Sequence, residues 1–557
     1  MKVVIVGGVA AGAAAAARLR RNDEKATILI LEKDEYISYS ACGLPYFIGD
    51  VITDGSRLLL QTPQGFKKRY NIDVRVSSEV TGVDTVRKLV EVKDLKTGKT
   101  STESYDELIL TPGAAPVVPP IEGIGLPHVF TLRSMADGLK IKEYIFSAHV
   151  KTAVVIGAGH IGLEITENLK HIGVAVTLID AADHVIPSID TDMAYEVHNH
   201  LRSKGVNLLL NTTVKTITPS SVVLAEGESV PADIVFVCIG SVPNTGFLRG
   251  NGSPNENGVK LGLKGGIIVD DYLRTTAPHV YAAGDAIVVT NRISGKPSFV
   301  PFAGPAARQA RIVADAICGK GEKYTGSLGT ELLRVFDITV GVSGLTESLL
   351  RDAGKPFYKV ITTANSRAGY FPGTSTITVK LIFGPKGELY GTQAMGSEGI
   401  DKTIDVLAVL LKLGCTVHDL PELEHGYAPP YSIVKDAVNV SGVVAEQLLE
   451  DPEGFYYIED VAALVASKEL ILDIRNAEEY RWGHIEGAVN MPLDTLRENL
   501  DKLDKNRILY AYCQSGARCN IAVQLLRQYG FKVKNLGGGY RFYSAMDTDL
   551  KARNVSG

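Results

Sequence analysis

The chain has 557 residues, of which 45% are hydrophobic and 22% charged, and this composition is typical of a soluble globular protein with roughly three or four domains. Its formal net charge of −5 argues against nucleic acid as the main partner, because that role needs a basic surface. No apolar run reaches about 18 residues, so the sequence predicts no membrane span. The six cysteines show neither a disulfide-framework spacing nor a Cys-x-x-Cys, and a predicted strand begins at Lys2, which leaves no room for a signal peptide. We therefore expect reduced thiols and a cytoplasmic protein.

The first predicted elements are a buried strand, residues 2–6, a glycine-rich turn and an alanine-rich helix. The turn consists of Gly7, Gly8, Val9, Ala10, Ala11 and Gly12. In the dinucleotide fingerprint such a turn places a pyrophosphate at the helix N-terminus, and an acid about 20 residues later binds the ribose. Glu32, at the end of the next predicted strand and followed by Lys33, fits that acid, although Val9 replaces the second glycine of the motif. A strand over residues 106–110 then leads to a returning turn at Gly113.

A single thiol, Cys42, follows the ribose acid by ten residues, in the stretch Ser-Tyr-Ser-Ala-Cys-Gly-Leu-Pro-Tyr at residues 38–46. Gly43 lets the backbone pass close to a flat ligand, and Pro45 is tolerated in the first turn of a helix. A cysteine just before a helix start favours the thiolate, and a thiolate beside a bound cofactor is a redox nucleophile. Taken alone, the same residue would be interpreted as a buried structural cysteine. The nucleotide motifs on both sides favour the redox interpretation.

Two basic clusters lie in the same region. The first cluster, on the helix after the glycine turn, consists of Arg18, Arg20 and Arg21. The second, farther along the chain, consists of Lys67, Lys68 and Arg69. Each is either a solvated face or a phosphate-binding patch near the thiol.

A second nucleotide unit begins with a predicted strand over residues 152–156. All three glycines of the fingerprint follow it, at Gly157, Gly159 and Gly162, and the next strand ends in Asp180. An aspartate there accepts hydrogen bonds from a ribose diol and repels a 2′-phosphate, and the two following alanines offer no arginine to hold one. This unit therefore favours NADH over NADPH. Another strand returns the chain at Gly240, as at the end of the first unit.

A third segment, residues 275–285, ends in Gly284 and Asp285. It resembles the third flavin motif of the two-dinucleotide disulfide reductases. The resemblance implies a FAD-binding domain formed by residues 1–149 and 243–323, with an NAD(P)H-binding domain at residues 150–242 inserted into it.

Disulfide reductases of the glutathione-reductase kind carry a redox pair in a Cys-x4-Cys spacing, whereas this chain has only Cys42 there. It therefore resembles the single-cysteine branch, which comprises coenzyme A disulfide reductases, NADH oxidases and NADH peroxidases. In that branch the thiolate works with flavin alone and forms a mixed disulfide or sulfenic acid. Members that reduce oxygen or peroxide commonly have a histidine inside the first glycine turn, where this chain has Ala10. The resemblance favours a reductase of coenzyme A disulfide, coenzyme A persulfide or polysulfide, and an NADH oxidase or peroxidase is the alternative.

The region 324–447 is similar to the dimerisation domain of coenzyme A disulfide reductases. The resemblance implies a homodimer with an active site shared between subunits, in which Tyr370 and Tyr427 reach the partner subunit's cysteine. It also implies a coenzyme A site, for which the candidate residues are Arg18, Arg21, Ser38, Ala41, Lys67 and Lys68. Ala41 departs from the family, whose members often have an asparagine at that position.

Beyond a linker at residues 448–454, the C-terminal region 455–557 carries the second reactive thiol. A strand over residues 508–512 ends in Cys513-Gln514-Ser515-Gly516-Ala517-Arg518, and a helix follows. A thiol at the end of a parallel strand, inside a loop of amides that leads into a helix, sits in an anion cradle suited to a persulfide, and Arg518 closes the ring of donors. Cys-x5-Arg phosphatases use similar geometry with a loop one residue longer. The neighbouring Cys519 is either a second sulfur acceptor or a residue packed into the helix.

The segments 483–490 and 537–540 complete the resemblance of this region to a rhodanese domain. The expected fold class is therefore α/β: two Rossmann-like domains, an α+β dimerisation domain and an α/β rhodanese domain. The expected function is a FAD- and NADH-dependent reductase of small disulfides, persulfides or polysulfides fused to a sulfurtransferase, with coenzyme A as substrate or carrier and no metal. A sulfur-carrier or redox-sensing protein, in which only Cys513 turns over, is a further alternative.

Overall fold

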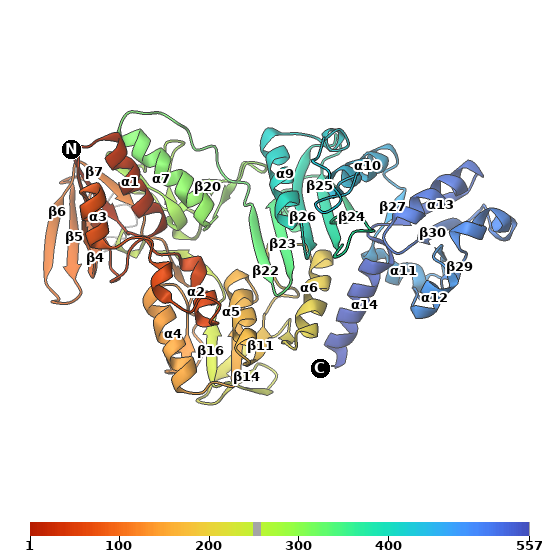
Figure 1. Ribbon diagram of the computed structural model, residues 1–557, viewed down its shortest axis with the longest axis horizontal. Helices are drawn as coiled ribbons and strands as arrows, with labels where there is room; N and C mark the ends of the chain where they lie inside the picture. The colour runs from red at the N-terminus through yellow and green to blue at the C-terminus, as the bar shows by residue number, and fades with distance from the viewer. Residues whose placement is uncertain (249–257, 556–557) are drawn as a thin grey trace. The chain divides into compact units, whose positions relative to one another are not determined.

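The computed structural model describes residues 1–248 and 258–555 (Figure 1). The chain groups into two compact units: Met1–Ala182 with Asn211–Ser327, and Asp183–Leu210 with Leu328–Gly557. Within the described ranges, no helix combines the length and the apolar character needed to cross a membrane.

In the first unit, a parallel sheet has the strand order β19-β7-β1-β2-β3. Its strands are β1 (Lys2–Val6), β2 (Thr27–Leu31), β3 (Asp73–Arg75), β7 (Glu107–Leu110) and β19 (Val280–Ala282). Helices α1 (Ala10–Asn22) and α7 (Ala303–Ile317) pack on each other. Strands β1, β2 and β7 each consist mainly of consecutive apolar residues, because both faces of a parallel sheet are covered. Strand β19 completes the sheet from far along the sequence, so this Rossmann-like region is discontinuous.

The same unit repeats this βαβ pattern in a second parallel arrangement, β11-β10-β16-β9. It contains β9 (Val129–Phe130), α4 (Met135–Ser147), β10 (Thr152–Ile156), α5 (His160–His171), β11 (Ala175–Ile179) and β16 (Ile234–Val237). Strand β8 (Ala114–Pro116) follows the turn at Gly113, and β17 (Ser241–Pro243) follows the turn at Gly240. These two strands pair antiparallel and so connect the two Rossmann-like regions.

Short strands and small helices complete the first unit. They are α2 (Leu44–Ile48), α3 (Pro63–Tyr70), β4 (Ser78–Asp84), β5 (Leu89–Asp94), β6 (Thr100–Ser104), β13 (Val214–Ile217), β14 (Ser221–Leu224), β15 (Ser229–Pro231), β18 (Ile267–Ile268), β20 (Ile287–Thr290) and β21 (Pro297–Ser298).

The second unit begins with an antiparallel sheet of order β22-β23-β26-β25-β24. The sheet and its helices are β22 (Glu331–Val335), β23 (Ile338–Gly344), α8 (Glu347–Asp352), β24 (Tyr358–Asn365), β25 (Thr376–Phe383), β26 (Leu389–Gly396), α9 (Ile400–Leu413) and α10 (Ala437–Glu450). Helix α9 covers β23 and β26, and α10 covers β24 and β25. Segment Asp183–Leu210, with α6 (Thr191–Ser203) and β12 (Asn207–Leu209), groups with this unit, although the sequence assigns it to the NADH-binding region.

The C-terminal part of the second unit is a parallel sheet of order β27-β31-β30-β28-β29 with flanking helices. Its elements are β27 (Phe455–Tyr456), α11 (Val461–Ala466), β28 (Leu470–Asp473), α12 (Ala477–Trp482), β29 (Val489–Asn490), β30 (Ile508–Tyr512), α13 (Ala517–Gln528), β31 (Lys532–Leu536) and α14 (Gly539–Val555). The predicted fold class, with Rossmann-like, α+β and C-terminal α/β parts, is confirmed.

Candidate active sites

The first glycine turn is shaped by contacts that only glycine tolerates. Gly7 has φ +93°, and a Cβ on Gly12 would lie 1.8 Å from the Gly7 carbonyl oxygen. Among the described residues no side chain caps the start of α1, so its first N–H groups are available to a phosphate. Val9, which replaces the motif's second glycine, has a negative φ of −95°.

The predicted ribose acid of this turn is held in place by the backbone. Glu32 is 6% exposed, and its carboxylate accepts hydrogen bonds from the N–H groups of Gly8 at 2.7 Å and Asp34 at 2.9 Å. Burial raises the pKa of Glu32, and the two backbone donors oppose that shift. Gly284, with φ +79°, lies against the same turn, since a Cβ there would be 3.1 Å from the Ala11 Cβ. The structure therefore brings together the segments that the sequence assigned to FAD.

The second glycine turn repeats this geometry with all its glycines. Gly157 has φ +103°, and a Cβ on Gly162 would lie 1.9 Å from the Gly157 carbonyl oxygen. Within the described part of the chain, nothing lies within 4 Å of a Cβ built on Gly159, so the backbone is open there for a ligand. The Asp180 carboxylate accepts hydrogen bonds from the N–H groups of Ala158 at 2.6 Å and Ala182 at 2.8 Å. The acid is therefore fixed at the mouth of the turn. The returning glycines Gly113 and Gly240 have φ +69° and +109°.

Cys42 lies in a 3₁₀ turn, Ala41–Gly43, directly before the short helix α2, and it is exposed. Partial burial of the thiol raises its pKa, the negative charges of Glu164 and Asp285 raise it further, and Arg133 opposes them. The expectation that the helix start lowers the pKa of Cys42 is wrong, because the protein groups around the thiol raise it. A helix of five residues has a small dipole, and two carboxylates act on the thiol.

Two residues near Cys42 were missed by the sequence analysis. Glu164 lies on α5, two residues after Gly162, and burial together with the charge of Glu167 raises its pKa to about 7. Arg133 donates to Asp285 at 2.8 Å, so the predicted cofactor aspartate is part of an ion pair. The position of Glu164 near the start of the helix after the glycine motif was the available signal.

Of the candidate phosphate-binding side chains, two are paired with carboxylates and two are exposed. Arg18 donates two hydrogen bonds to the Asp315 carboxylate, at 2.8 and 2.9 Å, and this pairing raises its pKa. Lys67 forms an exposed ion pair with Asp73 at 2.9 Å. The side chains of Arg21 and Lys68 are exposed, and Ser38 and Ala41 are half-buried beside Cys42.

The two predicted tyrosines lie together on the second unit. Tyr370 is 78% exposed and Tyr427 is 50% exposed. A hydrogen bond between their hydroxyl groups raises the pKa of Tyr427. Two adjacent exposed phenols are suited to a partner surface.

Cys513 follows β30 and is 1% exposed, with the Gly516 N–H donating to its Sγ at 3.0 Å. Gly516 has φ +95° and immediately precedes α13, so the loop leads into a helix start as expected. Arg518 forms two hydrogen bonds to the Glu479 carboxylate, at 2.7 and 2.6 Å, and therefore stands at the loop already paired. Cys519 is fully buried on α13, which supports the packed interpretation of that thiol, and burial raises its pKa well above the usual range.

A second arginine at this loop was missed. Arg475 is 2% exposed, forms an ion pair with Asp473 at 2.7 Å, and donates to the Gln514 side-chain oxygen at 3.3 Å. Its guanidinium lies 3.9 Å from the centre of the Tyr540 ring. Arg475 lies two residues after the end of β28, so its proximity to the loop follows from the parallel pairing of β28 and β30.

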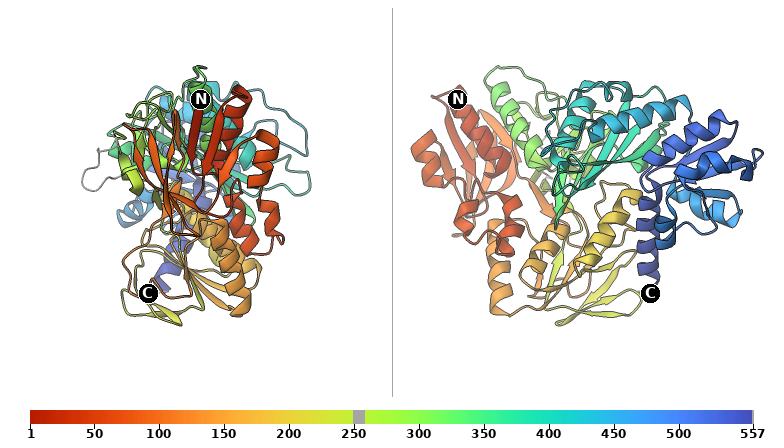
Figure 2. Two further views of the ribbon diagram at one scale, coloured as in Figure 1. Left: turned by 90° about the vertical axis from the view of Figure 1, so that its left-hand side faces the viewer. Right: turned by 45° about the vertical axis from the view of Figure 1, so that its right-hand side comes forward.

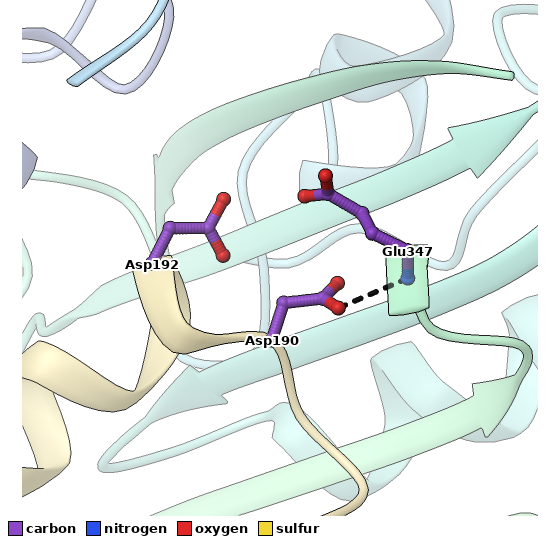
Figure 3. A group of neighbouring side chains, drawn as sticks. All are labelled: Asp190, Asp192 and Glu347. Atoms are coloured by element: carbon purple, nitrogen blue, oxygen red, sulfur yellow. Dashed lines mark hydrogen bonds between the residues drawn. The ribbon is translucent and has the colours of Figure 1, made fainter. Parts of the chain in front are cut away.

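A buried group of carboxylates in the second unit has the spacing of a metal site. Asp190, Asp192 and Glu347 bring one oxygen each within 4.8 Å of one another (Figure 3). The ammonium group of Lys380 lies 2.9, 2.7 and 2.5 Å from these three carboxylates, and Lys359 adds a second ammonium. The group is therefore a buried ion network with its own internal cations.

Two dinucleotide-binding turns, an exposed thiol beside one of them and a sulfur-binding loop define a redox enzyme class. The sequence profile described as pyridine nucleotide-disulphide oxidoreductase matches residues 1–307, its dimerisation domain matches residues 332–437, and the rhodanese-like domain matches residues 458–546. The chain belongs to the pyridine nucleotide-disulphide oxidoreductase family, and it ends in a rhodanese-like domain. The family resemblance predicted from the sequence is confirmed.

Individual relatives support this assignment over the whole chain. The chain is 34% identical over 450 residues to a coenzyme A disulfide reductase of Staphylococcus aureus (strain bovine RF122 / ET3-1), covering 80% of this chain and 100% of that protein. Reduced Bacillus anthracis CoADR-RHD is 40% identical with a TM-score of 0.95, covering 99% of this chain and 98% of that structure. A NAD-dependent persulfide reductase from A. fulgidus is 35% identical with a TM-score of 0.91, covering 98% and 100%.

Proposed function

We propose that the protein is a FAD- and NADH-dependent reductase of coenzyme A disulfide, coenzyme A persulfide or polysulfide, coupled to a sulfurtransferase domain. The observation that carries the proposal is the exposed thiol of Cys42 among Glu164, Arg133 and Asp285, in a chain with two glycine turns fit for dinucleotides. Full-length similarity to a coenzyme A disulfide reductase and a persulfide reductase supports the substrate class.

The protein groups fit the two cofactors. For FAD, they are the uncapped start of α1, the buried Glu32 carboxylate and the segment ending in Gly284 and Asp285. For NADH, they are the open backbone at Gly159 and the fixed carboxylate of Asp180. When bound, the pair supplies hydride chemistry and hence two electrons for sulfur reduction. We assign residues 1–149 and 243–323 to FAD, residues 150–242 to NADH, 324–447 to dimerisation and 455–557 to sulfur transfer.

At the first thiol, the Cys42 thiolate attacks one sulfur of the substrate disulfide. A Cys42–sulfur bond forms, the substrate S–S bond breaks, and the second half leaves as a thiolate. With a persulfide, attack on the outer sulfur leaves a persulfide on Cys42 and releases the carrier thiol. Glu164 has a pKa raised to about 7, so its carboxyl group can hold or release a proton near neutral pH.

For substrate binding, the proposed phosphate contacts are Arg21 and Lys68, which are exposed, and Arg18 and Lys67, which are paired with carboxylates. Charge-assisted hydrogen bonds of this kind are stronger than bonds between neutral groups. Ser38 and Ala41 line the cysteine segment. In the proposed homodimer, Tyr370 and Tyr427 reach the partner subunit's cysteine, where their hydroxyl groups can donate a proton.

At the second thiol, Cys513 takes sulfane sulfur from a donor and holds it as a persulfide within the loop amides, beside Arg518. It then passes the sulfur to a thiol carrier, which carries it to Cys42. All six cysteines lie in the described part of the chain as free thiols, which agrees with a reducing cytoplasm.

Anaerobic NADH oxidation tests the proposal with three acceptors: coenzyme A disulfide, coenzyme A persulfide and polysulfide. We expect turnover with at least one of them, loss of turnover in Cys42→Ser, and unchanged turnover with the disulfide in Cys513→Ser. Steady turnover with oxygen or hydrogen peroxide, and none with the sulfur acceptors, would instead establish the oxidase or peroxidase alternative. That alternative has less support, because Ala10 occupies the expected histidine position. Sulfur transfer by Cys513 without NADH oxidation by any acceptor would indicate a sulfur carrier.

A further inference from the structure

The C-terminal helix α14 begins directly against the loop that holds Cys513. The Tyr540 N–H donates to the Cys513 carbonyl oxygen at 2.8 Å, and the Arg541 N–H donates to the Gln514 carbonyl oxygen at 3.1 Å. A Cβ on Gly539, which has φ +68°, would lie 2.7 Å from the Cys513 carbonyl oxygen. The first turn of α14 therefore contacts the backbone of the sulfur loop without an intervening side chain.

These two hydrogen bonds orient the donors of the loop. In a planar trans peptide the N–H points opposite to the C=O. Holding the carbonyl groups of Cys513 and Gln514 toward α14 therefore directs the N–H groups of Gln514 and Ser515 away from α14. Those N–H groups belong to the loop that surrounds the sulfur, and fixed N–H groups stabilise an anion only while their direction is fixed. The cradle for a persulfide thus depends on the placement of the first turn of α14.

Helix α14 is in turn held along one side by α6, and the two helices lie side by side in Figure 1 and in the right-hand view of Figure 2. The contacts on α14 recur every four residues, so they form one stripe. Arg541 donates to the Glu196 carboxylate at 2.8 and 2.9 Å, and the Ala545 carbonyl accepts from Asn199 at 2.8 Å. Farther along the helix, Asp549 pairs with Arg202 and His198, and Arg553 donates to the Asp183 carbonyl at 2.9 Å. Directional polar contacts of this kind fix the rotation and the axial position of a helix.

The far end of the stripe is a buried ion network. Asp549 and His198 are both fully buried. Burial alone would raise the pKa of Asp549, but His198, Arg202 and Arg553 outweigh burial and lower it to about 2. The His198 Nε2 accepts the Val185 N–H at 3.1 Å, so the ring proton is on Nδ1, facing Asp549. This end of the stripe anchors the C-terminal part of α14. At the other end, the ion pair of Glu196 and Arg541 is the contact with α6 that lies nearest the sulfur loop.

We propose that Arg541, held by Glu196 of α6, is a positioning residue for sulfur transfer at Cys513. Its backbone N–H holds the sulfur loop, while its side chain is fixed by a helix from outside the rhodanese-like domain. The proposal rests on the proposed sulfurtransferase function of Cys513. It implies that the loop geometry is set by the reductase part of the chain and by the rhodanese-like domain together.

The test uses the full-length, FAD-loaded enzyme with thiosulfate as donor and cyanide as acceptor. The Cys513 thiolate attacks the outer sulfur of thiosulfate, which leaves a persulfide anion on Cys513 and releases sulfite. Cyanide then takes the outer sulfur as thiocyanate and restores the thiolate. The variants are Glu196→Gln, Arg541→Gln and the double variant, and the control is Lys551→Gln, which removes an exposed ion pair with Asp547 on the same helix.

We expect kcat for thiocyanate formation to fall about tenfold or more in both single variants, with KM for thiosulfate changed less than twofold. Because the two side chains act as one link, the double variant should be no slower than either single variant. Alkylation of Cys513 by iodoacetamide, followed by mass spectrometry in a Cys42→Ser background, gives a second readout. Its rate constant at a fixed pH should fall by about tenfold, since misdirected N–H groups stabilise the thiolate less.

Values of kcat and of the alkylation rate constant that match those of Lys551→Gln would overturn the proposal. If Arg541→Gln fails to fold, Glu196→Gln, which keeps the shape of the side chain, decides the outcome. A wild-type enzyme that forms no thiocyanate would count against the sulfurtransferase function itself. In that case the alkylation rate constant still reports whether Glu196 and Arg541 position the loop.

Discussion

Replacing Lys380 with methionine tests the buried ion network most directly. Lys380 is fully buried, and its ammonium contacts the carboxylates of Asp190, Asp192 and Glu347 at 2.9, 2.7 and 2.5 Å. Removing one partner from a buried ion pair costs about 3–5 kcal/mol, because a buried charge is left uncompensated. Lys359 remains beside two of the carboxylates. We therefore expect a loss near the lower limit, about 3 kcal/mol at pH 7.

The pH dependence of this loss follows from the carboxylate pKa values. Burial would raise the pKa values of Asp192 and Glu347, but in the wild type Lys380 and Lys359 outweigh burial and lower both. Their contribution to stability is therefore present above the unfolded-state pKa, and it is lost as the pH falls through the lower folded-state pKa. In Lys380→Met, one of the two ammonium groups that oppose the effect of burial is gone, so the pKa values of Asp192 and Glu347 in the folded protein are higher than in the wild type. The difference between variant and wild type should therefore shrink between pH 7 and pH 5.

Differential scanning calorimetry of the full-length protein measures the effect. For a folded unit of this size, about 3 kcal/mol corresponds to a lowering of roughly 6–12 °C in its transition temperature. The control is Lys551→Met, which removes only an exposed ion pair with Asp547, and exposed pairs contribute little to stability. A shift in Lys380→Met no larger than that of the control, or a shift that grows toward pH 5, would refute the electrostatic reasoning.

Three further predictions concern the reductase part. Gly162→Ala should abolish NADH binding while FAD stays bound, because the new Cβ would lie 1.9 Å from the Gly157 carbonyl oxygen; titration calorimetry with NADH checks this, and normal affinity would contradict it. Glu164→Gln should remove the change in NADH-dependent rate around pH 7, since the carboxyl with a pKa of about 7 is gone; a pH profile unchanged from wild type would count against that role. Asp180→Ala should raise kcat/KM for NADPH relative to NADH by about tenfold, because the carboxylate that repels a 2′-phosphate is removed; an unchanged ratio in steady-state kinetics would be inconsistent with this reading.

Several features of the sites lay beyond sequence reasoning because they join distant residues. Arg18 pairs with Asp315, almost 300 positions away, so a residue predicted to meet phosphate already has a carboxylate partner. The thiol of Cys42 lies within the electrostatic influence of Glu164 and Asp285, and this reverses the expected direction of its pKa shift. Neither effect has a local signature, because each depends on which side chains packing brings together.

The sequence alone determined the fold class, the glycine turns and the family, and it singled out Cys42 and Cys513 as the candidate thiols. These features follow from local rules: strand periodicity, glycine at positions where a Cβ would collide, and a thiol at the end of a strand. The tertiary structure decided which charges meet, as in the network around Lys380 and the stripe between α6 and α14. Ion pairs over such separations are set by the packing of whole elements, and no short stretch of sequence encodes that packing.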